Sequence, residues 1–292
     1  MKIQKVQALF EPGSVTFPED RLFLRPFSPE MAFVGVADGV SGLYIPSEGP
    51  RLFSEGTLTG GQMVTDTICH AFTEASRNDS LEEIILRAND AVAAIQIANG
   101  KGIPIERSDL LAGAAFAVAK IGEEVEILQA GDCFAFWKLQ DGEIGATRNQ
   151  VYQHDMVALE IVAQLMEKHG GDRNKMWREL SPILSEMRLQ HVNKNVEGGY
   201  ALCNGQSELE NCWQKITIPS DRLSFLILAT DGLIHYPESG DEKALARKVL
   251  TLFQKESLEA VLAETRRIEE REKGKSYADK GEATAIAIEF SS

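Results

Sequence analysis

The sequence contains no long hydrophobic run. No stretch of its 292 residues approaches the roughly 20 uninterrupted apolar side chains that a membrane-spanning helix needs. Residues 1–13 alternate polar and apolar side chains and lack the apolar block of a secretion signal. We therefore expect a cytoplasmic protein that has no membrane partner.

Basic side chains are also in short supply. The chain has 30 Lys and Arg residues against 44 Asp and Glu residues, so its formal net charge is −14. Proteins that bind nucleic acids usually present a basic face to the phosphates. The acidic excess argues against a nucleic-acid partner, and a chain of this charge that handles phosphate would need cations from solution.

Cysteine is scarce and scattered. The four cysteines, Cys69, Cys133, Cys203 and Cys212, form no CxxC pair. A structural zinc site normally shows paired ligands at short spacing, and without a secretion signal a disulfide framework is not expected. We predict four reduced thiols, with Cys133 acting as a small buried side chain rather than as a redox-sensitive one.

Segments with helical periodicity come in pairs, and strand-like runs lie between the pairs. The helical segments are 62–77 with 81–98, 156–168 with 175–189, and 242–254 with 258–271. The strand-like runs are 6–10, 21–27, 31–37, 114–121, 124–129, 134–139, 214–218, 224–230 and 283–290. Because strands follow one another and helices arrive in twos, the pattern favours an α+β fold of antiparallel sheets covered by helices. No linker or repeat divides the chain, so we expect one domain over residues 1–292.

Three strand-like runs end at an aspartate. They are 31–37 before Asp38-Gly39, 125–131 before Asp132, and 223–230 before Asp231-Gly232. One Asp-Gly pair after a strand is an ordinary turn, but three matching strand ends suggest a shared role. A carboxylate at the rim of an apolar core is costly unless it is neutralised, and no Lys or Arg is adjacent to these aspartates. A shared divalent cation would resolve this conflict, and oxygen-only ligands favour Mg²⁺ or Mn²⁺.

Three segments resemble signature blocks of the metal-dependent serine/threonine phosphatases of the protein phosphatase 2C type. They are FVGVADGVSG (33–42), LQAGDCFAFWKLQDGEI (128–144) and FLILATDGL (225–233). Further matches in the same order are Pro18-Glu19-Asp20, Gly113, Gly198-Gly199-Tyr200 and 283–286. The resemblance spans nearly the whole chain. It implies a four-layer αββα sandwich, in which paired helices flank two antiparallel sheets, and a variable helical insertion at 151–205 beside the site.

The resemblance implies hydrolysis of phosphoserine and phosphothreonine in proteins by a metal-activated water. The partner would be a phosphorylated protein, the cofactor two Mg²⁺ or Mn²⁺ ions with a third, weaker one, and the enzyme a monomer. Asp38 would bridge two ions, with the Gly39 carbonyl as a further ligand. The other implied ligands are Asp20 or its neighbour Glu19 for the second ion, Asp231 for the first, and Asp132 for the third. Asp38 and Asp231 are thus the expected catalytic residues.

Two departures from the family pattern concern the substrate. Family members usually carry an Arg shortly before the first acidic pair, where it grips the phosphate, and residues 13–17 contain none. Its absence should weaken phosphate binding by about 1.5–3 kcal/mol if it made one charged hydrogen bond. His235 stands where an acidic residue often follows Asp231, and it is a candidate proton donor to the leaving group.

A third departure concerns the metal. The acidic residue expected three positions before Thr284 is Gly281; Glu282 is our preferred substitute and Asp279 the reserve. These gaps keep two other functions open. One is a catalytically impaired relative that acts as a phosphoprotein-binding or regulatory module. The other is a phosphatase for small phosphorylated metabolites.

Overall fold

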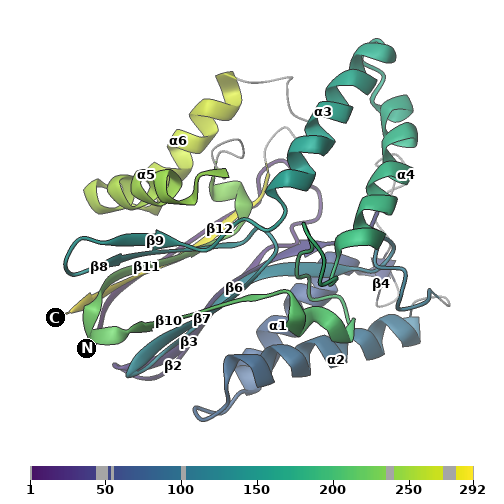
Figure 1. Cartoon of the computed structure of the whole chain (residues 1–292). Coiled ribbons are helices and arrows are strands. Elements are labelled where there is room, and N and C mark those ends of the chain that lie inside the picture. Colours follow the sequence, from purple (N-terminus) through teal and green to yellow (C-terminus); the bar gives the residue numbers. More distant parts are fainter. Residues whose placement is uncertain are drawn as a thin grey trace.

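The computed structural model describes residues 2–43, 52–53, 56–99, 103–234, 240–271 and 281–291. Two five-stranded antiparallel sheets lie face to face at its centre (Figure 1). The first sheet runs in the order β1 (Lys2–Glu11), β12 (Ala283–Ser291), β11 (Leu223–Ala229), β8 (Phe134–Leu139) and β9 (Ile144–Ala146). The second runs in the order β10 (Gln214–Pro219), β7 (Glu124–Ala130), β6 (Gly113–Ile121), β3 (Met31–Val40) and β2 (Arg21–Ser28). A short ladder pairs β4 (Leu52–Phe53) with β5 (Leu58–Thr59).

Side-chain alternation along the strands produces the layers. In β3, Phe33 belongs to the core on the outer face of the second sheet, whereas Val34 and Val36 belong to the core between the sheets. Successive strand residues point to opposite faces, so one apolar run such as 31–37 can serve both cores. Leu226 and Leu228 of β11 meet the β3 valines from the first sheet. Burying each such side chain contributes about 1.5–3 kcal/mol.

Helix pairs cover both outer faces of the sandwich (Figure 1). Helices α1 (Gly60–Glu74) and α2 (Leu81–Asn99) pack on the second sheet, and α5 (Glu242–Lys255) and α6 (Leu258–Arg271) pack on the first. Their apolar stripes supply the contacts: Ile68 and Phe72 from α1, Ile84 and Ile85 from α2, Val249 and Phe253 from α5, and Val261 from α6. The expected four-layer αββα sandwich is confirmed.

A third helix pair projects from one end of the sandwich and lies within the expected insertion at 151–205 (Figure 1). It consists of α3 (Tyr152–Lys168) and α4 (Arg173–His191), joined through two glycines with φ of 58° and 87°. Helix α3 begins four residues before the predicted Met156, and the Asn149 side chain accepts the N–H of Val151 just ahead of its first turn. The earlier start places His154 and Asp155 in that turn.

Two further expectations concern composition. Among the helices of the described ranges, none combines the length and apolar character needed to cross a membrane. All four cysteines are free thiols, as predicted. Cys133 is fully buried in the core between the sheets, which agrees with its expected packing role. Burial raises the pKa of the Cys133 thiol well above its usual value, and the nearby carboxylates add to that rise.

Candidate functional site

Four aspartates from separate elements meet at one end of the two sheets. Asp38 lies near the end of β3, Asp132 in the turn between β7 and β8, and Asp231 two residues after β11. Asp20 immediately precedes β2. The charges of Asp20, Asp231, Asp132 and Glu282 all act on Asp38. The structure therefore gathers the strand-end carboxylates that the sequence singled out.

Burial makes these carboxyl groups hard to ionise. It raises the pKa of Asp38 well above its usual value, and repulsion from Asp20 and Asp231 adds to the effect. Burial likewise raises the pKa of Asp132 to about 7 and that of Asp231 to about 6. Carboxyl groups that share a low-dielectric pocket repel one another when they ionise, so each keeps its proton to a higher pH than a free aspartate does.

Asp20 is the most enclosed of the four, with an exposed fraction of 2%. Burial raises its pKa to about 8, and the charge of Glu282 acts in the same direction. Thr230, the residue before Asp231, fixes the Asp20 carboxyl by donating its hydroxyl hydrogen to Oδ2 at 2.7 Å. The Thr230 hydroxyl also accepts the N–H of Thr284 at 2.9 Å. Thr230, which directly follows β11, thus connects the Asp20 carboxyl to Thr284 in β12.

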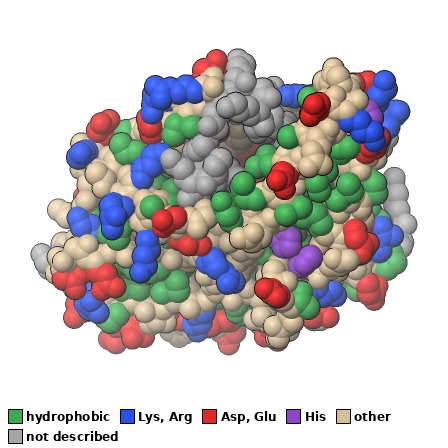
Figure 2. All heavy atoms as spheres, turned by 45° about the horizontal axis from the view of Figure 1, so that its top comes forward, with side chains coloured by type: hydrophobic (Ala, Val, Ile, Leu, Met, Phe, Trp, Pro, Cys, Tyr) green, Lys and Arg blue, Asp and Glu red, His purple; other side chains and the backbone are tan. Residues whose placement is uncertain are grey.

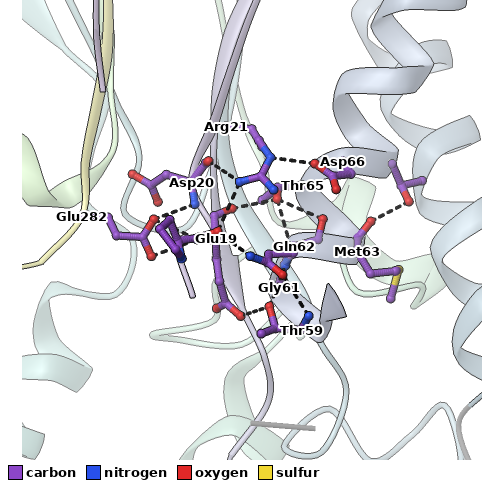
Figure 3. Close-up of polar contacts among 12 residues, drawn as sticks. Glu19, Asp20, Arg21, Thr59, Gly61, Gln62, Met63, Thr65, Asp66 and Glu282 are labelled. Carbon is purple, nitrogen blue, oxygen red and sulfur yellow. Dashed lines mark hydrogen bonds and ion pairs between the residues drawn. The ribbon is translucent and has the colours of Figure 1, made fainter. Parts of the chain in front are cut away.

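Glu282, the preferred substitute for the missing acidic residue, does reach this site (Figure 3). Its Oε1 accepts the N–H of Glu19 at 2.9 Å, and its Oε2 accepts the N–H groups of Glu19 at 2.8 Å and Asp20 at 2.9 Å. The carboxylate therefore clamps the backbone that carries Asp20. Asp279, the reserve candidate, and His235 lie outside the described residues.

The Glu19 and Asp20 side chains point in different directions, and this shows which of the two lies with the other aspartates. The Glu19 carboxylate accepts hydrogen bonds from the hydroxyls of Ser41 and Thr59 and from the backbone of Gly61. Because Thr59 caps α1, Glu19 serves the N-terminus of that helix, where a negative charge is favourable. Burial raises the pKa of Glu19 despite these donors. Of the two, Asp20 is the one that faces the other aspartates.

The fit of Glu19 against α1 depends on a glycine. A Cβ added at Gly61 would lie 2.5 Å from Cδ of Glu19, whose carboxylate is enclosed by its three donors. We expect Gly61→Ala to lower the free energy of unfolding by about 1–3 kcal/mol, measured by chemical denaturation. Gly122→Ala is the control, because its Cβ would lie 3.5 Å from the nearest atom, the Glu124 oxygen. Equal stability of the two variants would show that the Glu19 packing is loose.

The site also contains residues that the strand-end pattern did not identify. Asp155, in the first turn of α3, adds its negative charge to the surroundings of Asp231. Arg188, in the last turn of α4, opposes the rise in the pKa of Asp132 through its positive charge. A signal for Arg188 was present in the sequence. It follows Leu180 and Leu184 at helical spacing, so it places a charge on an apolar stripe.

Another arginine near the site is already engaged. Arg21 donates from Nε to Asp66 at 2.6 Å and from Nη1 to the carbonyls of Pro18 and Asp20 at 3.3 Å and 2.8 Å (Figure 3). These bonds turn its guanidinium toward α1. It therefore does not replace the arginine that is missing from 13–17.

The acidic end offers only oxygen donors to a divalent cation. Within the described ranges, no three His, Cys, Asp or Glu side chains converge closely enough to hold a metal ion as they stand. The chemistry of the donors nevertheless suits Mg²⁺ or Mn²⁺, since all are carboxylate or carbonyl oxygens. The charges that act on Asp38 and Asp20 come from other carboxylates. The residues fit by type, and binding would require the aspartate side chains to turn toward a common point.

The layered fold is shared with structures of known proteins. The chain has the fold of bacterial serine/threonine phosphatases of the protein phosphatase 2C type, which confirms the resemblance at the level of the fold. One such structure is serine/threonine phosphatase Stp1 from Staphylococcus aureus, with a TM-score of 0.57 and 14% identity over 100% of this chain and 96% of that chain.

Two further structures give the same result. Mycobacterium tuberculosis PstP/Ppp has a TM-score of 0.55 and 13% identity, over 99% of each chain. The catalytic domain of PstP in complex with two manganese ions has a TM-score of 0.54 and 14% identity, again over 99% of each chain. No protein-family model and no curated protein sequence matches the chain.

Proposed function

We propose that the chain is a phosphatase that uses Mg²⁺ or Mn²⁺ to hydrolyse phosphoserine and phosphothreonine in proteins, acting as a monomer in the cytoplasm. The observation that carries the proposal is the meeting of Asp38 and Asp231, which lie near the ends of strands from two different sheets, in one acidic pocket. The shared fold with bacterial serine/threonine phosphatases supports the same reading.

In this proposal, the ions would be held by the oxygens at the acidic end: the Asp20, Asp38, Asp132 and Asp231 carboxylates and the Gly39 carbonyl, with Glu282 completing the negative charge. Bound divalent cations would lower the pKa of the attacking water and neutralise charge on the phosphoryl oxygens. The protein needs no nucleophile of its own for that chemistry.

The chain's own residues prepare the pocket. Glu282 fixes the backbone of Glu19 and Asp20, and Thr230 orients the Asp20 carboxyl. Without cations, burial and repulsion from Asp20 and Asp231 raise the pKa of Asp38 and so disfavour its charged form. Bound cations would favour the ionised carboxylates instead, because metal ligands must be deprotonated.

The direct test is hydrolysis of p-nitrophenyl phosphate and of phosphoserine and phosphothreonine peptides with added Mn²⁺. We expect turnover that stops with EDTA and returns when Mn²⁺ is restored. A parallel panel of small phosphorylated metabolites separates a protein phosphatase from a metabolite phosphatase. Turnover that EDTA leaves unchanged would overturn the metal-dependent proposal.

Glu282 gives a more specific prediction. Glu282→Gln replaces one acceptor oxygen by an NH₂ group that faces the backbone N–H groups of Glu19 and Asp20. We expect Mn²⁺ affinity to fall by about 10- to 100-fold, as is typical when a group supporting a ligand is lost. Isothermal titration measures this change. Glu289→Gln, on the strand β12 that follows Glu282, is the matched control, because its surface pair with Lys5 (3.6 Å) contributes little. Equal affinities of both variants would contradict a role for Glu282.

A second candidate function is a non-catalytic phosphoprotein-binding or regulatory module. Two observations favour it: no ligand set is converged among the described residues, and residues 13–17 contain no arginine. The discriminating result would be a folded chain that binds no Mn²⁺ at millimolar concentration but retains a phosphopeptide in a calorimetric titration.

A further inference from the structure

A cavity of about 330 Å³ lies between the α3–α4 pair and the acidic end of the sheets. Asp132 and Gly131 line it on the sheet side, and Asp155 and Tyr200 line it beside α3. Figure 2 shows apolar side chains and histidines gathered on the surface over this helix pair. The cavity therefore joins the carboxylate site to the helical region without an intervening layer.

The wall formed by α4 is apolar except at its end. Trp177, Leu180, Leu184 and Met187 line the cavity from this helix, and Arg188 completes the row. A row of this kind excludes water and lowers the local dielectric constant, so a charge placed within it interacts strongly with an opposite charge. The arginine is thus located where an anionic ligand would be held most firmly.

One nitrogen of the Arg188 guanidinium lacks a hydrogen-bond acceptor among the described residues. Its Nη1 is buried and has no hydrogen-bond partner among the described residues. Buried guanidinium groups are normally paired, since leaving an N–H without an acceptor is costly. Its charge acts on Asp132 and Tyr200 on the same cavity. An acceptor brought in by a ligand would complete the arginine's hydrogen bonds.

A phosphate group has the acceptors that the Arg188 guanidinium needs. A phosphoryl group carries several acceptor oxygens and negative charge, and guanidinium is well suited to bind it. The arginine expected before Asp20 is missing, and Arg21 is held by Asp66 and two carbonyls. Arg188 instead lines the cavity from the helical side and acts on Asp132, one carboxylate of the acidic end.

We propose that Arg188 binds the phosphoryl group of the substrate, with the apolar α4 wall contacting the uncharged part of the phosphate monoester next to it. This inference rests on the proposed function, because the phosphoryl group must sit beside the acidic end to reach Arg188. It assigns substrate binding to the insertion at 151–205.

The test compares Arg188→Met and Arg188→Lys with the unchanged chain in saturating Mn²⁺. For Arg188→Met, we expect the KM for p-nitrophenyl phosphate and the inhibition constant of inorganic phosphate to rise by about 10- to 100-fold, the effect of losing one or two charged hydrogen bonds. The kcat should change less. Arg188→Lys should recover part of the loss, because it keeps the charge without the planar fork.

Arg178→Met is the matched control, since Arg178 is an exposed residue on the same helix. If the unchanged chain shows no turnover, the proposed function fails, and calorimetric titration of inorganic phosphate still tests Arg188. Phosphate binding that Arg188→Met abolishes and Arg178→Met preserves would support the inference. Equal binding by both variants, or no phosphate binding by the unchanged chain, would overturn it, as would an unchanged KM and inhibition constant in Arg188→Met.

Discussion

Asp38→Asn is expected to lower Mn²⁺-dependent phosphatase activity by about 1,000-fold or more, equivalent to about 4 kcal/mol of transition-state stabilisation. Asp38 lies at the centre of the acidic end, where four other carboxylates act on it. Asparagine keeps the size of the side chain but removes the charge that would hold the cations. Initial rates with p-nitrophenyl phosphate measure the effect.

The same substitution should make the metal-free protein more stable. Burial, together with repulsion from Asp20, Asp231 and Asp132, raises the pKa of Asp38 and makes its charged form costly in the folded chain; asparagine cannot ionise, so this cost is removed. We therefore expect a higher Tm together with lost activity, a combination that unfolding cannot produce. Asp221→Asn, at an exposed position before β11, should change neither property. An active Asp38→Asn variant would remove Asp38 from the site.

Stability of the metal-free protein is expected to fall as the pH rises from about 5 to 8. The pKa values of Asp231, Asp132 and Asp20 are raised from 3.8 to about 6, 7 and 8, in each case mainly by burial. The folded chain therefore holds more protons than the unfolded chain across this range, and that stabilisation is lost as the pH passes through the folded pKa values. Each extra proton corresponds to about 1.4 kcal/mol per pH unit.

The measurement is thermal unfolding with EDTA at half-unit pH steps. One extra proton held by the folded chain over two pH units accounts for a loss of about 3 kcal/mol. A loss of that size would lower the Tm by roughly 5–10 °C for a chain of this size. Added Mn²⁺ should restore more stability at pH 8 than at pH 5, because cations compete with protons for the same oxygens. A Tm in EDTA that is constant or rises with pH would contradict the acidic cluster.

The sequence predicted the layers well because they depend on local pattern. Buried strands such as 31–37 are continuous apolar runs, and the helix pairs have clear apolar stripes. The strand-end aspartates were found because a turn follows each strand directly. These features need only neighbouring residues to be recognised.

Other parts of the site depend on contacts between distant residues. Whether Glu19 or Asp20 faces the aspartates is decided by Ser41, Thr59 and Gly61, which engage Glu19. The place of Asp155 depends on where α3 begins, and the helical pattern at 156–168 did not reveal that the helix starts at Tyr152. Arg188 interrupts an apolar stripe in the sequence, but the sequence pattern did not predict that it shares a cavity with Asp132.

The clamp of Glu282 on the backbone of Glu19 joins positions 263 residues apart in the chain. Strand β12, which follows Glu282, pairs with both β1 and β11 inside the first sheet. Because β12 follows β3, β7 and β11 in the sequence, a growing polypeptide carries Asp38, Asp132 and Asp231 before Glu282 and β12 have been synthesised. In the proposed phosphatase, the metal site would therefore form only after β12 has been made and has paired with β1 and β11.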